Sequence, residues 1–336
     1  MAEGNAIEAV DLRKSYGEEV QALDGLTFSV PAGTVFGLLG PNGAGKSTTV
    51  KILTTLAHPD GGSAKVAGHD ILREPAQVRG SIGVVSQAGG LDREATGREN
   101  LRLQGQVFGM GGRELERRID ELLEQFRLTD AGKRLVREYS GGMQRRLDVA
   151  QGLVHKPKVL FLDEPTTGLD PEVRAEMWDE IARLAGAGLT VLLTTHYLEE
   201  ADQLAAQLAI VDKGKVVAEG SPDALKRELR GDAIHIELGT ETAAEEAVRE
   251  ALTRVDGLDE IIFDDRTLHA RAEDGARTVP AVLAALDGAD LAVAAVTVAR
   301  PSLDDVYLRF AGRTFGEAES GDGNRRTDNE KKEAVR

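Results

Sequence analysis

Apolar and polar positions follow two different patterns in the strands predicted before residue 230. Residues 6–30 alternate between the two classes, which is typical of half-buried antiparallel strands. Residues 35–39, 158–163 and 189–196 are continuous apolar runs, and such runs are typical of strands buried on both faces of a parallel sheet. Because helical segments separate these runs, we predict an α/β core with right-handed crossovers and an antiparallel β region before it.

Helices are predicted within residues 95–155 and after residue 170. Thr96 and Glu99 have the spacing of a capping box at the start of the first helix. Asp170 followed by Pro171 is typical of an N-cap and the first position of a later helix. Helical spacing of apolar residues is clearest at Leu115, Ile119, Leu122, Leu123 and Phe126.

The pattern restarts near Gly231 and predicts a small α+β domain. Its strands and helices follow the order β-α-β-β-α-β and then a closing helix capped by Ser302, so we expect a ferredoxin-like topology. From Arg313 onward the chain is polar and poor in aromatic residues, which predicts disorder. The expected parts are a nucleotide-binding domain at 5–231, an accessory domain at 232–312 and a tail at 313–336.

A glycine-rich loop follows the first continuous apolar run. Residues 40–47 match the pattern G-x-x-x-x-G-K-S, with a buried strand before them and a helix-compatible stretch after them. Glycines let such a backbone approach phosphate oxygens, and the N–H groups of the following helix hold the anion. Lys46 is placed to reach the β- and γ-phosphates and Ser47 to bind Mg²⁺. A flexible glycine turn is the alternative, but the full match in this context favours nucleoside triphosphate binding.

Two carboxylates end the second continuous run. Asp163 and Glu164 follow a buried strand at its C-terminal end, where ligands of open α/β sheets bind. Asp163 can hold Mg²⁺ directly or through water, and Glu164 can activate an attacking water as a general base. The alternative is that both residues simply begin a solvated loop. The presence of the phosphate loop in the same chain argues against this alternative.

Residues 139–147, YSGGMQRRL, predict a second anion cradle. Two glycines after Ser140 open a helix, so the N–H groups of that helix can also face phosphate. This cradle lacks a lysine of its own, and one chain needs one phosphate loop. It makes sense if it completes a nucleotide site on another molecule.

These motifs closely resemble the ATP-binding subunits of ABC transporters, over residues 5 to about 230. The resemblance implies a P-loop NTPase cassette with a mixed-sheet core, an antiparallel β subdomain and a helical subdomain at about 92–155. Six motifs stand in the order of that family: GPNGAGKST (40–48), Gln87 after an apolar strand, YSGGM (139–143), VLFLDE (159–164), TTGLD (166–170) and TTH (194–196).

The resemblance also implies a role for each matching position. Tyr16 would stack on adenine, Gln87 would contact Mg²⁺ and the attacking water, and His196 would touch the γ-phosphate. Asp170 would bridge two subunits. The implied catalytic residues are Glu164, His196, Gln87 and Lys46, and the implied metal ligands are Ser47, Gln87 and Asp163. The implied nucleotide contacts are Tyr16, Gly40, Pro41, Asn42, Gly43, Ala44, Gly45, Lys46, Ser47, Thr48, and, across the subunit interface, Ser140, Gly141, Gly142 and Asp170.

Several of these positions have a plainer interpretation. Tyr16 can simply cover a sheet edge, and Gln87 can satisfy backbone groups of a loop. Tyr139 and Met143 replace the usual leucine and glutamine of the signature, but neither change removes a phosphate contact, so we still expect ATP hydrolysis. The histidines without ligand spacing, to which we assign structural roles, are His58, His69, His155, His235 and His269.

Four segments and the extra domain are similar to drug-resistance exporters of the daunorubicin-resistance type. The segments are YSGGM, TGREN (96–100), TTHYLEEAD (194–202) and SLDDVYL (302–308). The resemblance implies an ATP-dependent homodimer with ATP and Mg²⁺ that energises export through a separate membrane permease. The alternatives are the ATPase of an importer, an exporter of a lipid or polysaccharide, and a soluble ABC ATPase without a transport role.

Composition narrows these alternatives. With 41 Lys and Arg against 57 Asp and Glu, the net charge of −16 disfavours a nucleic-acid partner. The absence of cysteine excludes disulfides, thiol catalysis and Cys-ligated zinc. No apolar run approaches the ~20 residues that span a bilayer, and the first residues do not resemble a secretory signal. We therefore expect a peripheral protein on the cytoplasmic face of the membrane, held there by its permease.

Overall fold

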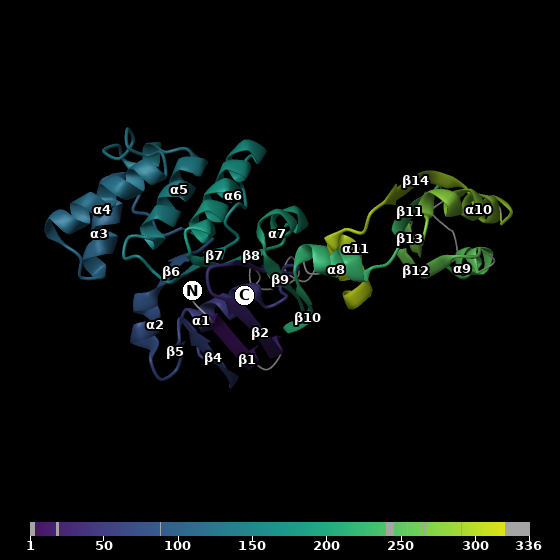
Figure 1. Cartoon of the computed structure of the whole chain (residues 1–336), viewed down its shortest axis with the longest axis horizontal. Helices are drawn as coiled ribbons and strands as arrows, with labels where there is room; N and C mark the ends of the chain where they lie inside the picture. The colour runs from purple at the N-terminus through teal and green to yellow at the C-terminus, as the bar shows by residue number, and fades with distance from the viewer. Residues whose placement is uncertain are drawn as a thin grey trace, which may run out of the picture. The chain divides into compact units, whose positions relative to one another are not determined.

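The computed structural model describes residues 4–17, 20–87, 89–239, 245–253, 255–264, 267–289 and 291–319. They form two compact units that divide between Ser221 and Pro222. Figure 1 shows the helices and strands of both units.

A six-stranded sheet forms the core of the N-terminal unit. Four neighbouring pairs of its strands run parallel, and β10 joins β9 in antiparallel orientation at one edge. In spatial order the strands are β10 (Lys215–Gly220), β9 (Gln207–Asp212), β3 (Val35–Leu39), β8 (Thr190–Thr195), β7 (Val159–Asp163) and β6 (Ile82–Val85). Every residue of β3 and β8 is buried, as the continuous apolar runs predict.

Each face of this sheet supports its own hydrophobic core. Side chains alternate along β7, so Leu160 and Leu162 pack with the helical region while Val159 and Phe161 pack on the other face. The helices of the helical region, which lie side by side in Figure 1, are α3 (Gly97–Val107), α4 (Gly112–Gln125) and α5 (Gly141–Gly152). The remaining helices of this unit are α1 (Lys46–Leu53), α2 (Pro75–Ser81), α6 (Pro171–Gly186), α7 (Leu198–Leu204) and the 3₁₀ turn η1 (Val136–Glu138).

The alternating residues near the N-terminus form an antiparallel sheet, as predicted. Its order is β2-β1-β4-β5, and its buried positions join α1 in the second core. The strands are β1 (Asn5–Tyr16), β2 (Val20–Pro31), β4 (Gly61–Val66) and β5 (His69–Asp70). The mixed core sheet, the antiparallel sheet and the helical region confirm the expected cassette architecture.

Two predicted helix starts are confirmed in detail. Thr96 caps α3 in a capping box, because its side chain accepts from the Glu99 N–H and the Glu99 carboxylate accepts from the Thr96 N–H. Asp170 caps α6 by accepting from the Val173 N–H at 3.0 Å, and Pro171 occupies the first position of the helix.

The C-terminal unit contains a second antiparallel sheet, of order β12-β13-β11-β14. Together with the element order β-α-β-β-α-β, this strand order confirms the ferredoxin-like topology. Its elements are β11 (Asp232–Leu238), α9 (Glu245–Leu252), β12 (Leu258–Asp264), β13 (Thr267–Ala272), α10 (Gly275–Asp287) and β14 (Val293–Ala299).

Two further helices of this unit, α8 (Pro222–Glu228) and α11 (Leu303–Ala311), pack on each other. Ser302 caps α11 in a capping box with Asp305, as its position predicts. Tyr307 is fully buried, and its ring meets Phe315 edge-on at 4.9 Å between centroids. Phe315 is itself buried, so ordered packing continues beyond residue 312, and the expected polar tail past residue 319 lies outside the described residues.

Candidate functional site

The loop between β3 and α1 is built for close approach of its backbone to an anion. A Cβ atom at Gly40 would lie 2.3 Å from the carbonyl oxygen of Val211, so no larger residue fits there. Gly45 has φ +108°, a conformation that L-residues with side chains rarely adopt. No described side chain caps the N-terminus of α1, so its first N–H groups can serve a bound phosphate.

Lys46 and Ser47 connect this loop to the end of β7. The buried ammonium of Lys46 donates to the carbonyl oxygens of Gly40 and Pro41 and lies 4.0 Å from Oε1 of Glu164. The Ser47 hydroxyl lies 3.5 Å from Oδ1 of Asp163, which also accepts from the Thr194 hydroxyl. The structure thus brings together two of the three predicted metal ligands, Ser47 and Asp163.

All four predicted catalytic side chains meet at the Glu164 carboxylate. Nε2 of Gln87 donates to Oε2 of Glu164 at 3.3 Å. Nδ1 of His196 lies 3.2 Å from Oε1, the oxygen that Lys46 also approaches. The Thr167 hydroxyl, which sequence reasoning did not single out, donates to Oε2 at 3.3 Å.

This environment favours an ionised Glu164. The contact with His196 lowers the pKa of the Glu164 carboxyl, and the charge of Lys46 adds to this effect, while partial burial opposes both. A carboxylate that is charged at neutral pH can accept a proton from a water molecule. The arrangement is therefore suited to the hydrolysis of a phosphate held by the loop.

The signature residues form a second cradle at the N-terminus of α5. Ser140 caps this helix by accepting from the Met143 N–H at 3.3 Å. A Cβ atom at Gly142 would lie 2.6 Å from Cγ1 of Val173, so a larger residue there would force Val173 to move. Among the described residues, no hydrogen bond joins Ser140, Gly141 or Gly142 to the phosphate loop of the same chain.

Tyr139 has a structural role in the signature. Its buried hydroxyl donates to the carbonyl oxygen of Ala131 at 2.7 Å, and a Cβ atom at Gly97 would lie 2.4 Å from that hydroxyl. The tyrosine therefore anchors the segment that leads into Ser140 and leaves the phosphate-facing positions unchanged.

Tyr16 and Asp170 lie apart from the Glu164 cluster. Tyr16 ends β1 with 44% of its surface exposed, and Nζ of Lys14 lies 5.6 Å from its ring centroid. Asp170 uses its carboxylate to cap α6. Neither observation tests the predicted adenine or interface role, and both roles stay predictions.

Sequence reasoning missed two buried charged residues near this site. Arg145 of α5 donates to four backbone carbonyls, and Glu200 of α7 is fully buried and accepts from the Thr166 hydroxyl at 2.7 Å and the Trp178 indole at 3.1 Å. A signal was present for Arg145, because it lies three residues after Gly142 and four before Val149, on the buried face of the helix.

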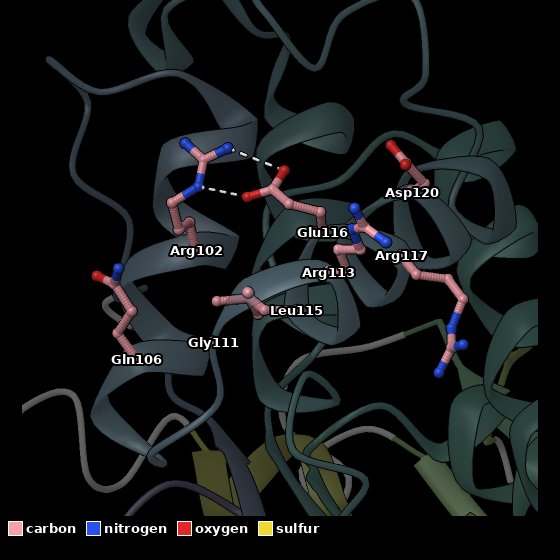
Figure 2. Close-up of a pocket in the computed structure, with 9 residues that line it drawn as sticks. Arg102, Gln106, Gly111, Arg113, Leu115, Glu116, Arg117 and Asp120 are labelled. Atoms are coloured by element: carbon pink, nitrogen blue, oxygen red, sulfur yellow. Dashed lines mark hydrogen bonds and ion pairs between the residues drawn. The ribbon is translucent and has the colours of Figure 1, made fainter.

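A cavity of about 590 Å³ lies between α3 and α4. Arg102 of α3 donates to both carboxylate oxygens of Glu116 of α4, at 2.8 and 3.0 Å (Figure 2). The cavity is open to solvent and none of the predicted site residues lines it. We interpret it as a surface groove between two helices that an ion pair joins.

The C-terminal unit contains a titratable group that sequence spacing did not reveal. His235 and His269 lie opposite each other on β11 and β13, and Nε2 of His235 lies 3.0 Å from Oδ1 of Asp305. The Asp305 contact raises the pKa of His235. Burial acts to raise the pKa of Asp305, but His235 and Ser302 outweigh it and lower that pKa to about 2.

This ion pair predicts a pH-dependent stability. The contribution of Asp305 is present above its ordinary pKa and is lost as the pH falls towards about 2. The contribution of His235 is present below its ordinary pKa and is lost as the pH rises through its raised value. His235→Gln should therefore lower the unfolding free energy by up to about 2 kcal/mol at pH 5 and by much less at pH 9, measured by thermal melting.

The control for this variant is His58→Gln, which changes an exposed histidine. It should leave the stability unchanged at both pH values. An equal loss at pH 5 and pH 9 for His235→Gln would show that packing, rather than the ion pair, accounts for the effect.

The chain matches known proteins over both of its units. The family model described as "ABC transporter" matches residues 23–167, and the model described as "ATP-binding protein DrrA1-3-like, C-terminal domain" matches residues 220–311. The chain is 46% identical to daunorubicin resistance ATP-binding protein DrrA2 of Streptomyces coeruleorubidus, over 92% of this chain and 96% of that protein. It is 44% identical to doxorubicin resistance ATP-binding protein DrrA of Mycobacterium tuberculosis, over 90% and 92%. It is also 40% identical to Nod factor export ATP-binding protein I of Paraburkholderia xenovorans, over 92% and 97%.

Solved structures show the same cassette. An ATP-binding subunit of an ABC transporter matches with a TM-score of 0.60 and 30% identity, over 66% of this chain and 92% of that chain. The ADP conformation of another ATP-binding cassette matches with a TM-score of 0.60 and 27% identity, over 66% and 92%. These matches confirm the predicted fold and nucleotide binding. The chain therefore belongs to the ATP-binding subunits of ABC transporters, in the group of the daunorubicin-resistance ATP-binding proteins.

Proposed function

We propose that this ATPase energises the export of drugs or other hydrophobic small molecules through a separate membrane permease. As an ABC ATP-binding subunit, the chain hydrolyses ATP and acts through a membrane partner. The observation that supports drug export is the match to daunorubicin-resistance proteins across both the cassette and the C-terminal domain. Among the described residues, none of the helices has the length and apolar character needed to cross a bilayer. We place the chain at the cytoplasmic face of the membrane, bound to its permease.

The nucleotide is proposed to bind as MgATP in the loop from Gly40 to Thr48, with the Tyr16 ring against the adenine. The oxygen atoms of Ser47 and Asp163 are hard donors that suit Mg²⁺, and they lie close enough together for one ion. Ser47 and Asp163 would hold this ion, which would supply positive charge against the triphosphate. Lys46 then adds a positive charge from the side of the loop.

Hydrolysis is proposed to use Glu164 as the general base. Gln87 and His196 contact different oxygens of this carboxylate, so they can orient it, together with the water that it activates. His196 and Lys46 approach the same oxygen of Glu164, which supports a role for His196 at the γ-phosphate. These roles explain why side chains from three separate motifs converge on one carboxylate.

The complete site is proposed to form between two copies of the chain. Ser140, Gly141 and Gly142 begin α5 and, in the part of the chain that the structure describes, make no hydrogen bond to the phosphate loop, so they would be available to the nucleotide of a partner copy. Asp170 caps α6, whose Val173 lies against Gly142, so Asp170 would lie at the same interface. ATP can drive closure only because it binds the closed dimer better than the open one.

The permease is proposed to contact the segment 88–110, which follows Gln87. On α3 in this segment, Leu103 and Val107 are 57% and 72% exposed at a spacing of four residues, so they share one face of the helix. An exposed apolar pair on a helix that follows Gln87 in the chain suits a short helix of a membrane partner.

A second candidate is the export of a substrate that is not a drug. The relatives named for Nod factor export match over almost the whole chain, so the domain arrangement is shared by exporters with different cargo. The ATPase mechanism is the same for both candidates, and only a transport measurement separates them.

Susceptibility of cells to drugs tests the proposal. A strain carrying the wild-type chain with its permease should tolerate amphipathic aromatic drugs at a concentration several-fold higher than a strain carrying the Glu164→Gln chain with the same permease.

The double variant Leu103→Asp, Val107→Asp tests the docking surface. It should abolish drug tolerance while the purified chain keeps its basal ATPase rate, because two charges on the exposed face of α3 disrupt docking alone.

Drug export would be rejected, and the second candidate favoured, if all strains were equally susceptible to every drug while the purified chain and permease together still hydrolysed ATP. If the double variant Leu103→Asp, Val107→Asp kept full drug tolerance, the docking surface would have to lie elsewhere.

A further inference from the structure

Arg145 makes four hydrogen bonds to the backbone around Glu164 and just before Gln87. This residue lies on α5, one turn after the signature glycines, and is 9% exposed. Among the described residues, every acceptor of its guanidinium is a backbone carbonyl oxygen at or just beyond the C-terminal end of β6 or β7. The acceptors are Pro165 from Nε at 2.7 Å, Ser86 from Nη1 at 2.9 Å, and Asp163 and Glu164 from Nη2 at 3.2 Å each.

Three of these carbonyls surround a strained peptide segment. Glu164 has φ +48°, in the left-handed region that residues other than glycine rarely adopt. Such a conformation persists only where its surroundings enforce it, and it is found most often at functional sites. Thr194 holds the N–H of Glu164 through its carbonyl and hydroxyl oxygens, at 3.2 and 3.1 Å. Arg145 holds the carbonyls on the other side of the same turn.

The same helix also holds the segment that carries Gln87. Arg145 binds the carbonyl oxygen of Ser86, directly before Gln87. Asp148, three residues further along α5, accepts from the N–H of Gly90 at 3.1 Å, shortly after Gln87. The backbone is therefore fixed to α5 directly before Gln87 and again three residues after it.

We propose that Arg145 is a positioning residue for ATP hydrolysis, which holds the strained turn of Glu164 and the backbone of Gln87 in the geometry that activates water. This inference rests on the proposed role of Glu164 as the general base. Within the described ranges, Arg145 donates no hydrogen bond to the side chain of Glu164 or Gln87, since its acceptors are backbone oxygens.

An arginine is required for this arrangement. Its planar guanidinium presents five N–H donors in a fixed fork, and here three nitrogens of the fork serve four oxygens from two separate segments. The single nitrogen of a lysine cannot reach both segments in this way. Burial lowers the pKa of Arg145, but an arginine stays charged in proteins, and Asp148 and Asp163 lie near enough to favour the charge.

The test compares Arg145→Met and Arg145→Lys with a matched control, an arginine on the neighbouring helix α4. Arg118 of α4 also donates to backbone carbonyls of this region, those of Leu153 at 2.8 Å and Val154 at 3.3 Å, but at the far end of α5. Arg118→Met should lower the melting temperature without lowering kcat. Arg145→Met should lower kcat about 10- to 100-fold while KM for ATP changes less than about threefold, because the loss falls on water activation. Arg145→Lys should give an intermediate kcat.

A second readout separates positioning of Glu164 from support of the signature helix. In a Glu164→Gln background, Arg145→Met should still accumulate as a dimer in MgATP, because dimer formation uses Ser140 to Gly142 and not the geometry of the base. Loss of that dimer, a change confined to KM, or a kcat equal to that of Arg118→Met would each overturn the proposal. If Arg145→Met does not fold, Arg145→Lys decides by the same criteria. Failure of the Glu164→Gln parent itself to form a dimer would instead contradict the shared nucleotide site.

Discussion

Glu164→Gln is expected to bind MgATP, to hydrolyse it at least about 100-fold more slowly than the wild-type chain, and to accumulate as a dimer. Glutamine has the size of glutamate and can still accept from Gln87 and Thr167, so the local fold is retained. An amide cannot take a proton from water. The substitution also removes a negative charge 4.0 Å from Lys46, which lowers the repulsion between the site and a triphosphate.

Size-exclusion chromatography with light scattering, together with a phosphate-release assay, measures both effects. The matched control is Glu172→Gln, which converts an exposed carboxylate in the first turn of α6 to an amide. This control should hydrolyse ATP at the wild-type rate. A Glu164→Gln protein that stays monomeric in excess MgATP would contradict the model of two nucleotides shared between two copies.

Lys46→Ala is expected to weaken ATP binding about 10- to 100-fold and to abolish measurable hydrolysis. Hydrogen bonds from an ammonium to phosphate contribute roughly 1.5–3 kcal/mol each, and alanine supplies none. Lys46 also holds the carbonyl oxygens of Gly40 and Pro41, so its loss removes contacts that shape the loop. Fluorescence titration with a labelled ATP analogue measures the change in affinity.

Lys51→Ala is the matched control, because Lys51 is an exposed lysine in the last turn of the same helix, α1. It should bind and hydrolyse ATP as the wild type does. If Lys46→Ala bound ATP with unchanged affinity but hydrolysed it slowly, Lys46 would contribute to the hydrolysis step and not to ATP binding.

The type of an element, helix or strand, could be predicted from the sequence where it depends on a local pattern of residues. The capping box at Thr96, the caps at Asp170 and Ser302 and the β-α-β-β-α-β order were all predicted, since each depends on residues within a few positions of one another. End points were less certain. The packing of Phe315 on Tyr307 continues the ordered chain beyond the expected boundary, because an aromatic residue in a polar segment can still find a partner in the fold.

Contacts between distant parts of the chain could not be read from the pattern. Gln87 and Glu164 are 77 positions apart, and only the parallel pairing of β6 with β7 places the ends of their strands side by side. The contact of His235 with Asp305 spans 70 positions in the same way, and no ligand spacing indicated it. The family resemblance supplied roles for the first pair, but not for the second.

The sequence by itself determined the nucleotide chemistry, the class of fold and the family, because phosphate loops, caps and buried strands depend on residue types at short spacing. Only the tertiary structure decided which oxygen of Glu164 each neighbour contacts, and that Arg145 holds the strained turn at this residue. Its hydrogen bonds join α5 to two segments that lie far away in sequence, and the acceptors are backbone carbonyls, which are present at every residue and carry no signature in the sequence.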